Sequence, residues 1–131
     1  HPLFTLVQQL LDASPGDVAK VEAILGQKLS QIRLNDETER HFNNFEAKSQ
    51  TGPLTRLELH VPKSRGGVSM LIDLRERPTR AEILQRFGPM KFPEYDSGGR
   101  KMLAQSYKGQ TLTWVINKKA LAERLLIQDG R

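Results

Sequence analysis

The sequence predicts an α+β protein, with a mainly antiparallel sheet and short helices packed on one face of that sheet. One observation is that a capped helical segment occurs twice, at residues 17–26 and 79–88, and strand-like sequence follows each copy. Another is that neighbouring strand candidates are joined by short turns, which suit antiparallel pairing. The chain length fits a single domain, residues 1–131, which the repeat divides into two helix-plus-strands units at approximately 1–76 and 77–131.

The two copies of the repeat share their end signals. Each opens with a residue that caps a helix N-terminus, Asp17 or Thr79, and each stops at a glycine, Gly26 or Gly88. Thr79 and Glu82 also have the spacing of a capping box, in which each side chain satisfies a free backbone donor. We therefore expect two short helices that end in the left-handed conformation that glycine tolerates.

The chain opens with two helix candidates in succession. Apolar residues recur at helical spacing between Phe4 and Ala13, and the turn Ser14–Gly16 separates them from a second helix, Val18–Leu25. The second helix is too apolar to present polar side chains to DNA base edges. The stretch Leu29–Leu34 is suited to a strand, and the charged run Asn35–Arg40 reads as a solvated loop.

An antiparallel hairpin is predicted in the middle of the chain. Apolar residues alternate with polar ones along Leu57–Val61 and again along Val68–Leu74, and the glycine-containing segment 62–67 connects the two stretches. Before this hairpin, Phe42 and Phe45 lie three residues apart, which suits either a helical turn or a bulged strand.

The second unit continues as a helix, an irregular loop from Gly88 to Arg100, and three strands. The strand candidates are Lys101–Tyr107, Thr111–Asn117 and Glu123–Gln128. The face of the middle strand that carries Trp114 is expected to meet the helices. Residues 119–128 have good helix propensity as well, but we expect a strand there.

Composition limits the possible functions. No run approaches the ~20 consecutive apolar residues of a membrane span, and the chain has no cysteine for a disulfide, a thiolate metal site or a nucleophile. It begins at His1, which fits a mature protein after signal-peptide removal or a trimmed chain boundary. The net charge of +5 lies entirely in residues 73–131, which carry twelve basic and seven acidic groups. Such a half suits an acidic partner, nucleic acid or anionic lipid, or simply gives solubility.

No catalytic constellation appears. His41 lies near Asp36, Glu37 and Glu39 in the sequence, but the spacing is not that of metal ligands. No serine occupies a nucleophile elbow, and the glycines of Ser97–Gly99 form a turn and do not lead into a helix. We therefore expect a protein that is not an enzyme, with no cofactor, no metal and no small-molecule substrate.

The loop from Gly88 to Gly99 is the richest candidate for a binding site. It places methionine and aromatic residues among prolines, glycines and charges, a composition typical of interface centres. Alternatively, Met90 and Phe92 fold back over the sheet edge. The predicted partner-binding residues are Met90, Lys91, Phe92, Tyr95, Asp96 and Arg100.

Several segments resemble the β-lactamase inhibitory protein-like and SmpA/OmlA-like small periplasmic domains. The similar segments are Leu10–Gly16, Asp17–Gly26, Phe87–Pro89, Gln105–Tyr107, Leu112–Val115, Asn117 and Leu125–Ile127. The resemblance spans most of residues 10–128 as two copies, although no proline follows Gly26 and the cysteines common in secreted members are missing.

The resemblance implies a periplasmic or secreted protein with a non-enzymatic binding role. The expected function is that of a bacterial envelope protein that binds and inhibits or neutralises another protein, as an inhibitor or immunity protein. One alternative is an envelope assembly or scaffold subunit. Another is a cytoplasmic nucleic-acid-binding module that uses the basic second half, which is disfavoured because few aromatic rings are interleaved with the charges.

Overall fold

A computed structural model describes residues 1–13 and 16–129 as an eight-stranded antiparallel sheet with four short helices. The helices are α1 (Pro2–Asp12), α2 (Val18–Leu25), α3 (Asp36–His41) and α4 (Arg80–Phe87). The strands are β1 (Ser30–Ile32), β2 (Phe42–Lys48), β3 (Leu54–Pro62), β4 (Ser69–Leu74), β5 (Tyr95–Ser97), β6 (Arg100–Tyr107), β7 (Gln110–Ile116) and β8 (Ala122–Asp129). The predicted α+β class with a mainly antiparallel sheet is confirmed.

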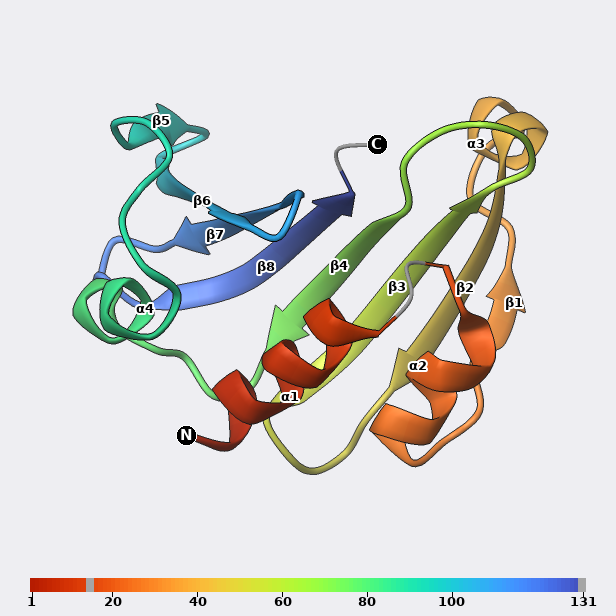
Figure 1. The fold of residues 1–131 in the computed structure, drawn as a ribbon, viewed down its shortest axis with the longest axis horizontal. Helices are drawn as coiled ribbons and strands as arrows, with labels where there is room; N and C mark the ends of the chain where they lie inside the picture. The colour runs from red at the N-terminus through yellow and green to blue at the C-terminus, as the bar shows by residue number, and fades with distance from the viewer. Residues whose placement is uncertain (14–15, 130–131) are drawn as a thin grey trace.

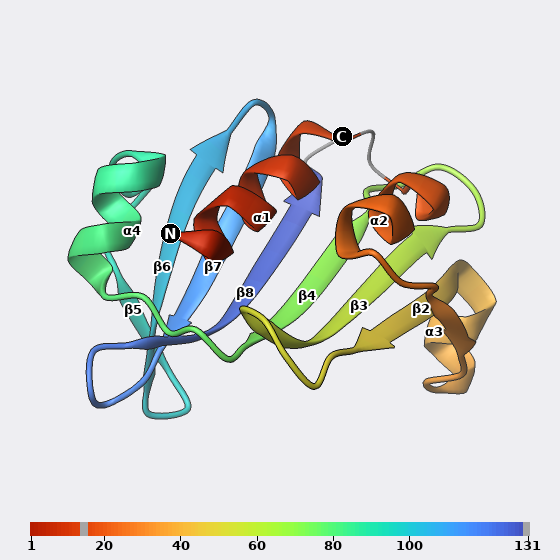
Figure 2. The same cartoon turned by 90° about the horizontal axis from the view of Figure 1, so that it is seen from below.

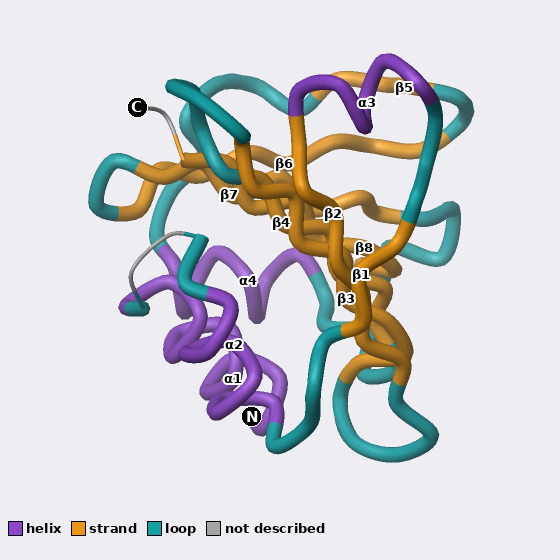
Figure 3. The backbone as a smooth tube through the Cα atoms, turned by 90° about the vertical axis from the view of Figure 1, so that its right-hand side faces the viewer, coloured by secondary structure: helices purple, strands orange, loops and turns teal. Residues whose placement is uncertain are grey.

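The strands form one sheet in the order β1-β2-β3-β4-β8-β7-β6-β5 (Figure 1). Strands β1 to β4 follow one another as a meander, and β5 to β8 form a second meander in the reverse spatial order. The two meanders meet where β4 pairs with β8, with Ser69 opposite Gln128 and Asp73 opposite Arg124. Helices α1, α2 and α4 cover one face of the sheet, whereas α3 lies apart from them (Figures 2 and 3).

The core lies between these three helices and the sheet. One row of cross-strand partners runs through five strands: Leu57, Ile72, Leu125, Trp114 and Leu103. Each of these side chains is fully buried. The ring of Trp114 lies 6.2 Å from that of Phe4 in α1 and 5.9 Å from that of Phe87 in α4, measured between centroids. The prediction that the Trp114 face meets the helices is therefore confirmed.

A buried glutamine joins this aromatic cluster to the end of α4. Gln105 Oε1 accepts a hydrogen bond of 2.9 Å from Trp114 Nε1, and Gln105 Nε2 donates to the carbonyl of Gly88 at 2.6 Å. A second, longer contact of 3.4 Å reaches the carbonyl of Ile83. Gln105 thus satisfies the indole N–H and a carbonyl just beyond α4, groups that are costly to bury unpaired.

The helix end signals are confirmed at three of the four ends of the repeat. Asp17 accepts a hydrogen bond from the Lys20 amide at 3.1 Å, and Gly26 has the left-handed conformation with φ 72° and ψ 24°. Thr79 and Glu82 form the predicted capping box. Gly88, with φ 93° and ψ −171°, is not in the left-handed helical region, so α4 leaves its last turn along a more extended path.

The capping box makes the stability of α4 depend on pH. The pKa of Glu82 is lowered by its hydrogen bond with the Thr79 backbone and then by that with the Thr79 hydroxyl. A lowered carboxyl pKa stabilises the fold above the unfolded-state value of about 4.5, and this contribution is lost as pH falls through the folded-state value. Glu82→Gln keeps the hydrogen-bonding shape without the charge, so we expect the stability advantage of wild type over this variant to shrink below that pH. Urea unfolding at a series of acidic pH values measures the difference in free energy of unfolding between the two proteins. A difference that grows as the pH falls would contradict this prediction.

Two segments differ from the prediction for the first unit. The run Asn35–Arg40, expected as a solvated loop, contains α3 instead. Asn35 caps this helix by accepting a hydrogen bond from the Thr38 amide at 2.8 Å. The carboxylates of the helix lie in its first turn, and Arg40 and His41 lie in its last. This charge order suits the helix dipole. The strand expected at Leu29–Leu34 is confirmed only over Ser30–Ile32.

The alternatives left open by the sequence are resolved in favour of strands. Phe42 and Phe45 both belong to β2, and their odd spacing places them on opposite faces. Residues 122–129 form β8, so the strand expected within 119–128 is confirmed. The loop expected to be irregular up to Arg100 contains the short strand β5, and the predicted turn at Ser14–Gly16 includes residues outside those described. None of the described helices is long and apolar enough to cross a membrane.

Candidate functional site

The face of the sheet that turns away from α1, α2 and α4 carries a mainly apolar strip in its centre. Leu71, Leu126, Thr113 and Ala104 are successive cross-strand partners on β4, β8, β7 and β6. We call this side of the sheet the open face. Leu71 and Leu126 are only half-buried, so the strip remains partly accessible.

The loop between α4 and β5 lies along the β6 edge of this face. The Lys91 amide donates to the Ala104 carbonyl at 2.7 Å, and Lys91 Nζ reaches Thr111 Oγ1 on β7 at 3.4 Å. Glu94 is bound by the guanidinium of Arg80 in α4, with Nη2 to Oε2 at 3.0 Å. The loop is therefore held at both its middle and its end, although it has no regular structure before β5.

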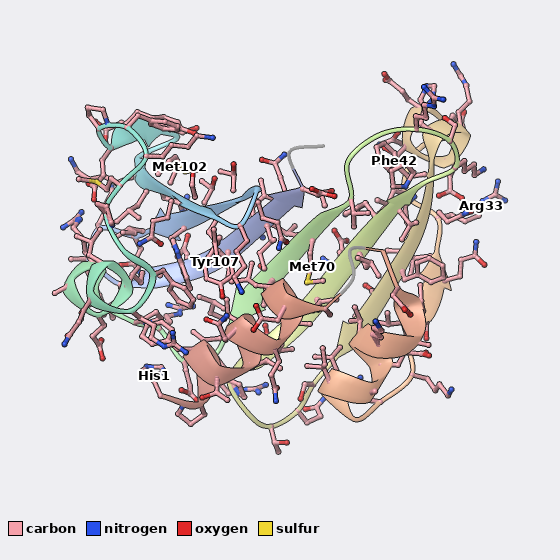
Figure 4. The ribbon with its side chains drawn as sticks, in the orientation of Figure 1. His1, Arg33, Phe42, Met70, Met102 and Tyr107 are labelled. Atoms are coloured by element: carbon pink, nitrogen blue, oxygen red, sulfur yellow. The ribbon has the colours of Figure 1, made fainter. Side chains whose placement is uncertain are left out.

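Three large side chains of this loop and of β5 are exposed to solvent, and we call them the aromatic patch: Met90, Phe92 and Tyr95. Their exposed fractions are 41%, 43% and 47%. The rings of Phe92 and Tyr95 lie 6.0 Å apart at 33° to each other. Tyr95 pairs across the strands with Met102, which Figure 4 places beside β5. Met90 and Phe92 therefore do not fold back fully over the edge of the sheet.

The charged residues predicted for the site are divided between two places. Asp96 lies beside the patch and is 3.8 Å from Lys101 Nζ. Lys91 extends over the sheet as described. Arg100 instead forms an ion pair with Glu123 of β8, away from the patch.

Two further basic residues near this region in sequence point elsewhere. Arg86 donates to Gln8 of α1 at 3.3 Å, and Lys108 Nζ lies 3.7 Å from Asp12, also in α1. Tyr107 reaches the same helix, donating to Asp12 Oδ1 at 3.2 Å (Figure 4). A hydrogen bond from Gln8 and then those from Tyr107 and Lys108 outweigh burial and lower the pKa of Asp12. The basic residues of residues 86–108 do not form one cluster.

A polar network lies on β2 and β3, on the polar face that the alternation along Leu57–Val61 predicted. His60 Nδ1 lies 2.7 Å from Asn44 Oδ1, and its Nε2 lies 3.3 Å from Glu58 Oε2. Glu58 is buried and is also bound by Arg56, whose Nη2 lies 2.9 Å from Glu46. Alternation alone identifies the polar face but not which side chains on it become buried.

The network has the features of a structural element. The guanidinium of Arg56 binds both of its carboxylates, those of Glu46 and Glu58. Within residues 1–13 and 16–129, no group of three or more His, Asp or Glu side chains is arranged to hold a metal ion.

Comparison with known proteins adds a fold relative. No family model and no curated protein sequence matches the chain. The crystal structure of YjgB, a DUF4309 family protein from Bacillus subtilis, is similar over 96% of this chain and 97% of that one, with a TM-score of 0.60 and 10% sequence identity. At this level of identity the likeness concerns the fold alone, and the similarity to inhibitory and SmpA/OmlA-like domains stays a prediction of the sequence.

Proposed function

We propose that the chain is a non-enzymatic bacterial envelope protein that binds another protein, as an inhibitor or immunity factor, through the aromatic patch. One observation carries the proposal. The exposed large hydrophobic residues of the described chain are Leu34, Met90, Phe92 and Tyr95, and three of these four lie within the short segment that also carries Lys91 and Asp96. Aromatic and methionine side chains of this kind are enriched at interface centres.

The surroundings of the patch indicate the chemistry of the partner. The patch continues onto the open face through Tyr95 and Met102, so an apolar surface can extend from the loop over the sheet. Lys91 and Lys101 lie at its margin, and both are exposed cations. The fitting partner presents an apolar recess bordered by carboxylates, because charge complementarity at the rim speeds and orients association.

The test compares two variants in affinity capture from the envelope extract of the source organism. Phe92→Ala/Tyr95→Ala/Asp96→Ala removes both rings of the patch and the carboxylate beside it, and Leu34→Ala removes a similarly exposed hydrophobic residue elsewhere. We expect one partner to be retained by wild type and Leu34→Ala, and its affinity to fall by about tenfold or more in the triple variant. Circular dichroism and thermal unfolding verify that all three proteins are folded. Equal affinity of the triple variant and wild type for that partner would refute the site.

The envelope location and the inhibitory role come from the sequence resemblance and need their own measurement. Fractionation of cells that express the native gene is expected to place the protein outside the cytoplasm. Recovery in the cytoplasmic fraction would contradict the location without affecting the binding surface.

A further inference from the structure

A groove lined by basic side chains lies at one end of the sheet, where three connections converge. These are the β4–α4 connection, the β5–β6 turn and the β7–β8 turn. All three gather at the lower left of Figure 2, away from α3 and from the β3–β4 loop. They come from residues 75–79, 98–99 and 117–121, so no local sequence pattern brings them together.

Backbone contacts hold the three connections in place. The Ala122 amide donates to the Pro78 carbonyl at 2.9 Å, and Thr79 forms a β-bridge with Leu121. Asn117 Oδ1 accepts from the amides of Lys119, at 2.9 Å, and Leu121, at 3.2 Å, and so fixes the β7–β8 turn. These hydrogen bonds fix the backbone from which the side chains of the β7–β8 turn project.

The groove consists of two hollows of about 540 and 440 Å³ that share Arg77 and Arg100. Five cationic side chains line them, and we call this set the basic groove: Arg77, Arg100, Lys118, Lys119 and Arg124. The β5–β6 turn approaches closely, since a Cβ added at Gly99 would lie 3.9 Å from Lys118 Cε.

The charges of the basic groove do not balance. Its two carboxylates are already engaged: Asp73 Oδ1 lies 2.8 Å from Arg124 Nε, and Glu123 pairs with Arg100. Within the described residues, no carboxylate pairs with the side chains of Arg77, Lys118 or Lys119. Three cations without counter-charges thus face one hollow, and a bound anion would relieve their mutual repulsion.

We infer that the basic groove binds a small molecule that carries two or more phosphate or sulfate groups. Arginine matches such groups with two parallel hydrogen bonds, and lysine adds a point charge. The combined hollows have the size of small-molecule sites and exceed what a single inorganic ion fills. The basic groove shares no residue with the aromatic patch, so this inference does not rest on the proposed function.

Isothermal titration with inorganic tripolyphosphate tests the inference at low ionic strength, where screening is weak. We expect saturable binding of one molecule per chain, and a loss of at least about tenfold in affinity for Arg77→Ala/Lys118→Ala. Arg77→Lys, which keeps the charge but loses the planar fork, is expected to lie between wild type and the double variant.

Arg40→Ala/Arg65→Ala is the matched control. It removes the same charge from exposed positions in α3 and the β3–β4 loop, so we expect a change of no more than about twofold. Equal losses in both double variants would show binding to net charge alone and would overturn the inference. Absence of binding to the folded wild-type protein would also overturn it. Amide chemical shifts of Gly98, Gly99 and Lys119 should move on binding, and shifts confined to other residues would place the site elsewhere.

Discussion

Replacing Gln105 with alanine is expected to lower the free energy of unfolding by about 4 kcal/mol. The change removes the acceptor of the buried Trp114 indole N–H and the donor to the part-buried Gly88 carbonyl. It also leaves a cavity beneath α4, because Gln105 is fully buried. Urea unfolding followed by fluorescence measures the effect, since Trp114 is the chain's single tryptophan.

Gln110→Ala is the control for this loss. Gln110 lies on the neighbouring strand, is half-buried, and donates one hydrogen bond of 2.9 Å to the Leu11 carbonyl. Its removal is expected to cost about 1 kcal/mol, the usual net value of one such bond. A loss for Gln105→Ala no larger than that for Gln110→Ala would contradict the role assigned to the buried glutamine.

Arg56→Ala is expected to lower the free energy of unfolding by about 2 kcal/mol. Burial opposes the charge of Arg56, but the hydrogen bonds and charges of Glu46 and Glu58 outweigh it and raise the pKa of the guanidinium. Without the arginine, two neighbouring carboxylates face each other on adjacent strands, and that of Glu58 is only 9% exposed. Thermal or urea unfolding at neutral pH measures the difference.

Arg124→Ala separates this effect from the loss of any ion pair. Arg124 pairs with Asp73 on the same face of the sheet, but its side chain is 48% exposed and its partner can be hydrated. Such surface pairs contribute about 0 to 1 kcal/mol. If Arg124→Ala destabilises the protein as much as Arg56→Ala, burial of Glu58 does not explain the cost of removing Arg56.

Elements with strong periodicity or defined caps were predictable. Helix α2 begins at the residue after Asp17 and ends at the residue before Gly26, as the end signals indicated. The alternation of Leu57, Leu59 and Val61 predicted β3 because one face of that strand is buried under the helices. In both cases the local sequence agrees with the tertiary environment.

Elements that bury little were not predictable in the same way. Helix α3 has no buried residue, so the apolar periodicity that marks a helix is absent. The charge order from Asp36 to His41, together with the cap at Asn35, was the available signal. Strand β5 is exposed at all three positions and lies at the sheet edge, so alternation does not mark it either.

The residues of the aromatic patch lie close together in the sequence, so the composition of that one segment was enough to identify them as a candidate site. The basic groove does not follow from any local pattern. Arg77 and Lys118 lie far apart in the sequence and become neighbours only because the β4–α4 connection is bonded to the start of β8. Likewise, the sequence associated Arg100 with the loop, whereas its side chain pairs with Glu123 because β6 and β8 lie on either side of β7 in the sheet.

The position of β8 bears on when the protein acquires its structure during synthesis. This strand comes after the other seven in the chain, yet it lies between β4 and β7 near the centre of the sheet. A nascent chain that lacks residues 122–129 therefore exposes the edges of both neighbouring strands, which are prone to pair with other chains. The complete sheet cannot form until residues 122–129 have left the ribosome. Because the paired residues of β4 and β8 lie far apart in the sequence, we expect the pairing of these two strands to be slow.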